Sequence, residues 1–224
     1  MTEGFATTKR VVIEDVTPRV DEGRFPAKRI VGDVVTVEAD VFADGHDRVA
    51  AMVRYKRRGD KTWRKVPMEP IVNDRFEASF TVDEIGRYAF TVEGWVDHYA
   101  TWREGLLKKQ EAGVVTSADL DIGAGLFEAG ASRASGKSAE LLSKTATLLR
   151  SPKLDIADRV EAATSAVAAT TMRAAPDRTN ATIHDTTYEI EVDRERARFS
   201  AWYELFPRSW GESGGHGTFL DVAD

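Results

Sequence analysis

The chain has 224 residues, 42% of them hydrophobic, which is enough to build the core of one or two domains. Its net charge of −6 argues against a dedicated nucleic-acid binder, which usually carries a basic field. The lack of cysteine excludes disulfides and thiolate metal sites. The sequence shows neither an apolar leader nor an apolar run long enough to span a membrane, so we expect a cytoplasmic location and no membrane partner.

Residues 1–116 show the alternation of apolar and polar residues that is typical of β-strands. Turn-forming residues separate the alternating runs, for example at Asp44–Asp47 and Glu84–Gly86. Short strands at this spacing predict an all-β sandwich of immunoglobulin-like kind. The clearest runs are Val35–Val41, Phe76–Val82 and Tyr88–Val92.

Residues 117–184 change to helical spacing, with apolar residues every three or four positions. Ser117 offers an N-cap, and the alanine content is that of a strong helix former. We expect three short helices packed as an inserted bundle, with Gly123 and Ala124 allowing close helix approach. Strand alternation returns in residues 185–198, where Tyr188, Ile190 and Val192 predict the last strand of the sandwich.

Residues 199–224 hold the most distinctive segment, which lies within "RFSAWYELFPRSWGESGGHGTFL". The stretch Phe199–Phe206 is apolar on both faces, as in a central strand covered by helices. A glycine-rich loop follows, and Thr218 with Asp221 forms an acidic variant of the capping box. Strand, loop and helix start together predict the first unit of an α/β domain.

The motif "SAWYELFPRSWG", followed by "GTF" and "DV", resembles the start of the catalytic (β/α)₈ barrel in maltosyltransferases that use α-maltose 1-phosphate. These are α-amylase-superfamily proteins of glycoside hydrolase family 13. The upstream stretches "RFPAKRIVGDVVTVEADVFADGHD" and "GRYAFTVEGWVDHYATWR" are similar to the same family, in the same order. Only residues 199–224 correspond to the barrel, so the chain looks like the N-terminal part of a longer enzyme.

The resemblance implies maltosyl transfer from α-maltose 1-phosphate to an α-1,4-glucan with retention of anomeric configuration. Retaining chemistry needs two carboxylates, and in this superfamily both come from later barrel strands. We therefore expect no catalytic residue, no cofactor, no metal and no activity from these residues alone. Arg208 and Ser209, at the end of the expected barrel strand, are weak candidates for substrate binding, whereas Glu204 is expected to be structural.

Three other features have both a functional and a structural interpretation. The stretch Arg54–Lys65 holds seven basic residues and one acid; it could bind an anion, but a solvated hairpin tip is favoured. The aromatic group in Trp95–Trp102 could stack sugars, but packing in a core is favoured. The four histidines have no metal-binding spacing, and Gly211–Gly217 lacks the lysine of a phosphate-binding loop.

The function favoured by the sequence is the non-catalytic N-terminal region of a maltosyltransferase, which braces the barrel and supports a homodimer. A stand-alone glucan-binding sandwich and a pure protein-interaction region are the alternatives. Exposed coplanar aromatic rings would favour a glucan binder, whereas apolar docking patches would favour a bracing region.

Overall fold

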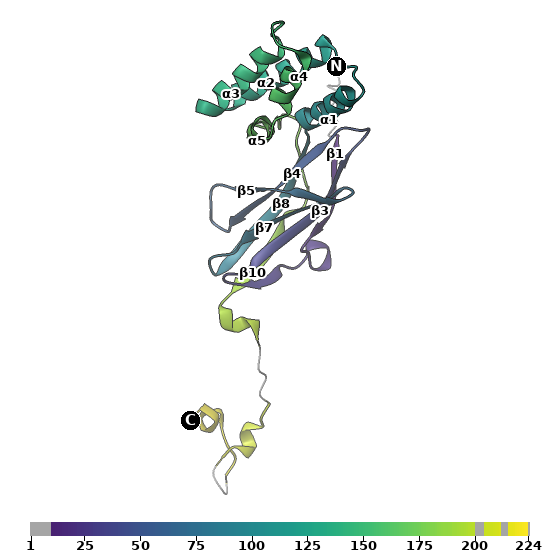
Figure 1. The fold of residues 1–224 in the computed structure, drawn as a ribbon. Coiled ribbons are helices and arrows are strands. Elements are labelled where there is room, and N and C mark those ends of the chain that lie inside the picture. The colour runs from purple at the N-terminus through teal and green to yellow at the C-terminus, as the bar shows by residue number, and fades with distance from the viewer. Residues whose placement is uncertain (1–9, 200–203, 212–214, 224) are drawn as a thin grey trace, which may run out of the picture.

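The computed structural model describes residues 10–199, 204–211 and 215–223. In chain order, eight strands are followed by five helices, two further strands and a short C-terminal segment. Figure 1 shows the helices at one end of the strand region and the C-terminal segment beyond the other end. Among the described residues, no helix is long and apolar enough to cross a membrane.

The strands form two sheets that pack face to face. One sheet has four strands in the order β1-β3-β7-β6, and the other has the path β2-β10-β8-β4-β5, with β9 paired to β8. The strands are β1 (Val11–Thr17), β2 (Ala27–Ile30), β3 (Val34–Ala43), β4 (Val49–Arg57), β5 (Arg64–Pro67), β6 (Glu69–Val72), β7 (Arg75–Thr81), β8 (Gly86–Val96), β9 (Thr182–Ile183) and β10 (Tyr188–Asp193).

The predicted alternation explains how the two sheets share one core. On β3 and β7, Val35 faces Phe80 and Val37 faces Ala78 in antiparallel register. All four side chains are buried, because every second residue of a strand points to the same face. Inward residues of both sheets, including Phe90 of β8, belong to one continuous cluster.

The last strand joins the sheet that was built before the helices. In β10, Ile190 is paired antiparallel with Tyr88 of β8 and parallel with Ala27 of β2. Tyr188, Ile190 and Val192 are all buried. This pairing confirms the prediction that the strand after the helices returns to the sandwich.

The helices are more numerous and begin earlier than the sequence predicted. They are α1 (His98–Glu111), α2 (Ser117–Arg133), α3 (Gly136–Leu149), α4 (Ile156–Thr164) and α5 (Ala166–Ala174). Helix α1 lies within the stretch that was assigned to strands, and it begins there because Asp97 caps it, accepting a hydrogen bond from Ala100 N at 2.9 Å. Ser165 separates α4 from α5 and caps the second of them.

The five helices bury their own core, apart from that of the sheets. Its fully buried members include Phe127 of α2, Leu142 of α3 and Val160 of α4. Glycine permits close contacts here, since a Cβ on Gly123 would lie 2.0 Å from the indole of Trp102 and one on Gly130 would lie 2.7 Å from the sulfur of Met172. The expectation of close helix approach along the glycine- and alanine-rich face of α2 is therefore confirmed.

Candidate functional site

Arg208 and Ser209, the weak substrate-binding candidates, lie in the short 3₁₀ helix η3 (Pro207–Ser209), and both are exposed. Gly217 N donates to Arg208 O at 3.1 Å and closes the loop around them. The helix start that was predicted downstream is present as α6 (Phe219–Ala223), with Thr218 Oγ1 donating to Asp221 at 2.7 Å. The capping interaction is therefore confirmed.

The described residues of the stretch Phe199–Phe206 do not form the predicted strand. Glu204, Leu205 and Phe206 have no strand conformation, and residues 200–203 lie outside the described residues. A strand is stable when its backbone groups pair with a neighbour, and Leu205 and Phe206 pair with none of the described strands. Glu204 is exposed.

The aromatic group of Trp95–Trp102 packs inside the molecule and does not form a sugar platform. Trp95 and Tyr99 are 6% and 8% exposed, and the Tyr99 hydroxyl donates to Ala163 O at 2.8 Å. Trp102 contacts Phe127 edge-on and donates its indole N–H to Asp119 O at 2.8 Å. Burial raises the pKa of Tyr99 to about 12. The favoured structural interpretation of these rings is confirmed.

The basic stretch Arg54–Lys65 forms the hairpin of β4 and β5. Arg54 pairs with the buried Glu93 at 3.4 Å, and Arg57 forms an ion pair with Glu84. Two cations of β4 lie against the ring of Trp63, with Arg54 Cζ 5.5 Å and Lys56 Nζ 5.0 Å from its centre. Arg54 and Arg57 are thus paired within the fold, whereas the basic side chains near the tip, Arg58 and Lys61, are exposed, as expected for a solvated hairpin tip.

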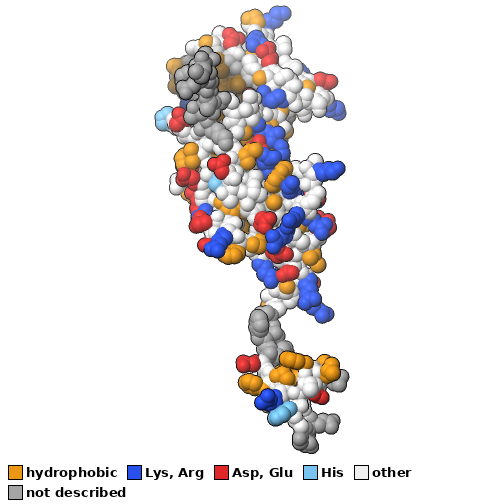
Figure 2. Space-filling view, turned by 180° about the vertical axis from the view of Figure 1, so that it is seen from behind, with side chains coloured by type: hydrophobic (Ala, Val, Ile, Leu, Met, Phe, Trp, Pro, Cys, Tyr) orange, Lys and Arg blue, Asp and Glu red, His pale blue; other side chains and the backbone are white. Residues whose placement is uncertain are grey.

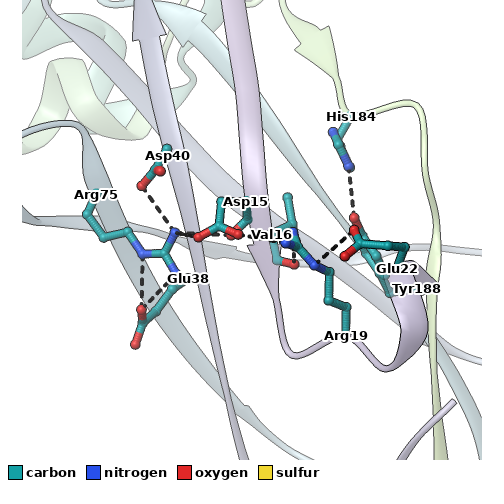
Figure 3. Close-up of polar contacts among 9 residues, drawn as sticks. All are labelled: Asp15, Val16, Arg19, Glu22, Glu38, Asp40, Arg75, His184 and Tyr188. Carbon is teal, nitrogen blue, oxygen red and sulfur yellow. Dashed lines mark hydrogen bonds and ion pairs between the residues drawn. The ribbon is translucent and has the colours of Figure 1, made fainter. Parts of the chain in front are cut away.

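A dense polar network connects strands of the four-stranded sheet where the chain leaves β1 (Figure 3). Arg75 of β7 donates to the backbone oxygen and the carboxylate of Asp15, both at 3.0 Å, and to Asp40 at 3.1 Å. Asp15 also pairs with Arg19 at 2.8 Å. Nearby, His184 and the Tyr188 hydroxyl share a hydrogen bond of 3.1 Å. These groups satisfy one another, so the network braces the crossover segment.

An open cleft of about 640 Å³ separates helix α1 from the loop between β3 and β4. The backbone N–H of Arg48 donates to Thr101 Oγ1 at 2.8 Å, which fixes the loop against the helix. Glu104 forms ion pairs with Arg48 and, at 2.7 Å, with Lys108. These cations, Arg48 first, lower the pKa of Glu104 to about 2.

The remaining walls of the cleft come from the sandwich. They include Phe42 at the end of β3, His46 and Asp47 in the loop, and Asp74 in the turn between β6 and β7. Asp47 accepts from Arg10 at 2.7 Å. The sequence does not predict this cleft, because its lining residues come from three distant segments, of which only Asp44–Asp47 carries a pattern, that of a turn.

Within the described parts of the chain, no group of three or more His, Cys, Asp or Glu side chains could hold a metal ion. In the polar cleft, Arg48 and Lys108 already bind the carboxylate of Glu104. The described residues thus present a polar cleft, a hairpin rich in basic residues and an apolar C-terminal segment.

Comparison with known proteins gives one consistent family. A sequence model described as alpha-1,4-glucan:maltose-1-phosphate maltosyltransferase, domain N/S, matches residues 9–194. Relatives of that name from Chlorobaculum tepidum, Myxococcus xanthus and Methylacidiphilum infernorum are 48%, 40% and 37% identical. The alignments cover 97%, 95% and 95% of this chain but 32%, 33% and 32% of the relatives. The chain therefore spans about a third of the length of these relatives.

Proposed function

This chain belongs to the family of the N/S domain of alpha-1,4-glucan:maltose-1-phosphate maltosyltransferases, and from that premise we propose that it is the non-catalytic N-terminal region of such an enzyme. In this proposal the two sheets are an immunoglobulin-like sandwich, and helices α1 to α5 are an inserted bundle. Residues 199–224 begin a catalytic barrel that contributes the carboxylates. The enzyme extends an α-1,4-glucan from α-maltose 1-phosphate in the cytoplasm.

The observation that carries the bracing role is the apolar surface of the C-terminal segment. Figure 2 shows hydrophobic side chains gathered there. Phe206, Trp210, Phe219 and Leu220 are 73%, 59%, 83% and 79% exposed. Isolated soluble proteins rarely expose so many large apolar groups together, so a further part of the same polypeptide is the natural cover for them. The sandwich would then hold the first barrel segment in place.

The proposal extends to a homodimer, as the family resemblance implies. Apolar side chains on the helices are available for a second copy, since Ile122 of α2 and Val167 of α5 are each 60% exposed.

A stand-alone glucan-binding module is the alternative. Its main support in the sequence was the aromatic group of Trp95–Trp102. Trp95 and Tyr99 are buried and Trp102 packs against Phe127, which weakens this alternative.

The test measures phosphate release from α-maltose 1-phosphate with maltohexaose as acceptor. We expect no turnover above a protein-free control for the 224-residue chain, and turnover for a longer chain that includes the barrel. In the longer chain, Phe206→Asp should lower activity and thermal stability, whereas Phe25→Asp, on the sandwich surface, should change neither. Turnover by the 224-residue chain, or equal behaviour of the two variants, would contradict the proposal. Sedimentation equilibrium of the longer chain tests the dimer.

A further inference from the structure

We propose that the helical bundle, α1 to α5, is hinged on the sandwich and swings about two adjacent chain crossings when the ion pair between Arg48 and Glu104 is broken. The sheets and the helices, which lie end to end in Figure 1, bury two separate hydrophobic cores. Bodies with their own cores that meet through a small or polar interface are expected to move relative to each other. This motion does not depend on the activity of any longer chain.

The junction between the bundle and the sandwich is incompletely packed. A cavity of about 60 Å³ lies between the end of the six-stranded sheet and helices α2 and α5, and the open cleft of about 640 Å³ lies on the α1 side. Trp95 is buried at the smaller cavity, yet it belongs to neither core cluster of the described residues. Protein cores hold few voids larger than a water molecule, so this junction has room for the helices to shift.

The chain passes between the two bodies twice, and both crossings lie against the smaller cavity. The outgoing crossing is at residues 96–97, between β8 and α1, and the return crossing is at residues 176–177, between α5 and β9. Two crossings that lie side by side define one axis, whereas crossings far apart would prevent rotation. Hinges are commonly found at the ends of elements, where a few backbone angles absorb the movement.

Helix α1 and the end of α5 belong to the moving body. The hydroxyl of Tyr99 in α1 donates to Ala163 O of α4 at 2.8 Å. Arg133 Nε of α2 donates to Ala175 O, just after α5, at 3.1 Å. These bonds join the first and last helices to the rest of the bundle, so the bundle moves as a unit.

The return segment belongs to the sandwich from Arg178 onwards. The guanidinium of Arg178 lies 3.5 Å from the carboxylate of Glu93, a buried residue of β8. Strand β9 pairs with β8, and His184 N donates to Val92 O at 2.9 Å. The pivot on this side is therefore limited to residues 176–177.

Exposed polar contacts hold the bundle in the observed orientation. Arg48, in the loop between β3 and β4, forms an ion pair with Glu104 of α1, and its backbone N–H donates to Thr101 Oγ1 at 2.8 Å. Arg173 of α5 lies 3.3 Å from Glu69 of β6, and both side chains are more than 60% exposed. The Arg48 and Glu104 side chains are 60% and 33% exposed. Ion pairs of this kind are weak and are screened by salt, so ionic strength sets how often the bundle swings away.

Distances between spin labels across the junction test the proposal. The chain has no cysteine, so Glu77→Cys on β7 and Lys144→Cys on α3, both at exposed positions, place one label on each body. In the full 224-residue chain we expect one narrow distance distribution at about 0.05 M salt. A second, shifted population should appear at about 1 M salt, where the Debye length is only about 3 Å. Glu104→Gln should show this second population already at the lower salt concentration.

The matched control is Glu128→Gln, which breaks an ion pair with Arg150 inside the bundle and should keep the distribution of the parent chain. An unchanged distribution in Glu104→Gln would overturn the proposal, and so would an equal change in the two glutamine variants. A parent distribution that stays the same at about 1 M salt would overturn it as well.

Amide hydrogen exchange distinguishes hinge motion from unfolding. The backbone N–H of Arg48, which bonds to Thr101 across the junction, should exchange at least about tenfold faster in Glu104→Gln than in the parent chain. The amide of Leu142, which is buried in the core of the bundle, should exchange at the parent rate. Equal acceleration at both amides would mean that the variant is destabilised as a whole and would contradict the hinge. Unchanged exchange at Arg48 would contradict it too.

Discussion

Trp102 of helix α1 lies directly against the backbone of Gly123 in helix α2. A Cβ added to Gly123 would stand 2.0 Å from Cζ2 of the indole, far inside van der Waals contact. The same indole donates to Asp119 O one turn earlier in α2 and meets the ring of Phe127 edge-on. The glycine therefore sets how closely the first helix, which continues from the sheet, approaches the rest of the bundle.

Gly123→Ala should destabilise the bundle, because the methyl group must displace a ring that is held on two sides. Overpacking of this kind costs about 1–3 kcal/mol, which lowers Tm by roughly 2–12 °C in a domain of this size. Gly125→Ala, two residues along the same helix and in open space, is the matched control and should gain up to about 1 kcal/mol from helix propensity. Thermal melts of both variants that coincide would contradict the close-packing role of Gly123.

The sequence predicted the strands well because their core is built on a strict period of two. Val35 and Val37, opposite Phe80 and Ala78, alternate with polar residues in a way that only a two-faced sheet explains. Helix α1 was not predicted, because it follows β8 after the single residue Asp97, and the aromatic residues on both sides of that junction look continuous. A helix boundary set by one capping carboxylate leaves little trace in the hydrophobic pattern.

The candidate cleft could not be predicted from the sequence, for a different reason. Asp74 and Glu104 come close to the β3–β4 loop only because α1 folds back over the end of the sandwich, where Arg48 holds it. No spacing in the sequence encodes that contact. The candidates Arg208 and Ser209 were placed through a family resemblance, and neither of them lines the cleft between α1 and the β3–β4 loop.

The capping box at the start of α2 should make stability depend on pH in acid. Thr116 N and Oγ1 donate to the Asp119 carboxylate at 3.0 and 2.7 Å, and Lys109 pairs with it. Lys109, then Thr116, lowers the pKa of Asp119 to about 2. A lowered folded-state pKa stabilises the protein above the unfolded value near 4, and this contribution is lost as the pH falls towards 2.

Urea unfolding at pH 6 and at pH 2.5 should therefore show a smaller loss of stability in Asp119→Asn than in the parent chain. Thr116→Ala, which removes the reciprocal cap, should cost about 1 kcal/mol at pH 6. An Asp119→Asn variant whose stability falls as steeply with acid as the parent's would show that the carboxylate is not coupled to folding. Asp121→Asn, on the exposed side of the same helix, is the control.

Tyr99 should make the bundle sensitive to alkali. Burial raises its pKa to about 12, above the unfolded value of 10.0, so its stabilising contribution is complete below pH 10 and is lost as the pH rises through 12. Tyr99→Phe loses the hydrogen bond to Ala163 O and should be about 1 kcal/mol less stable at pH 8. At pH 11 the two proteins should differ less, because phenylalanine cannot ionise. A gap that is equal at both pH values would contradict this account.

The C-terminal segment should add little to the stability of the sandwich and should promote association. Among the described residues, the last ion pair to the sandwich is that of Arg198, whose guanidinium lies 2.7 Å from Asp33. Beyond it, Phe199, Phe206 and Phe219 are 82%, 73% and 83% exposed. Burying such rings is worth several kcal/mol at about 25 cal/mol per Å² of apolar area, and the isolated chain does not realise this gain within itself. A chain that ends at Arg198 should therefore keep its Tm and stay monodisperse at higher concentration.

Paired thermal melts and static light scattering at matched concentration measure both effects. A second variant, Phe206→Ser with Phe219→Ser in the full chain, should reduce scattering as the deletion does while leaving every residue before Arg198 in place. If the deletion lowers Tm clearly and the double variant does not, backbone contacts of the segment support the sandwich. If both lower Tm, the aromatic side chains belong to its core. Unchanged Tm with reduced scattering in both is the result expected of a segment whose apolar side chains are meant for another part of a longer polypeptide.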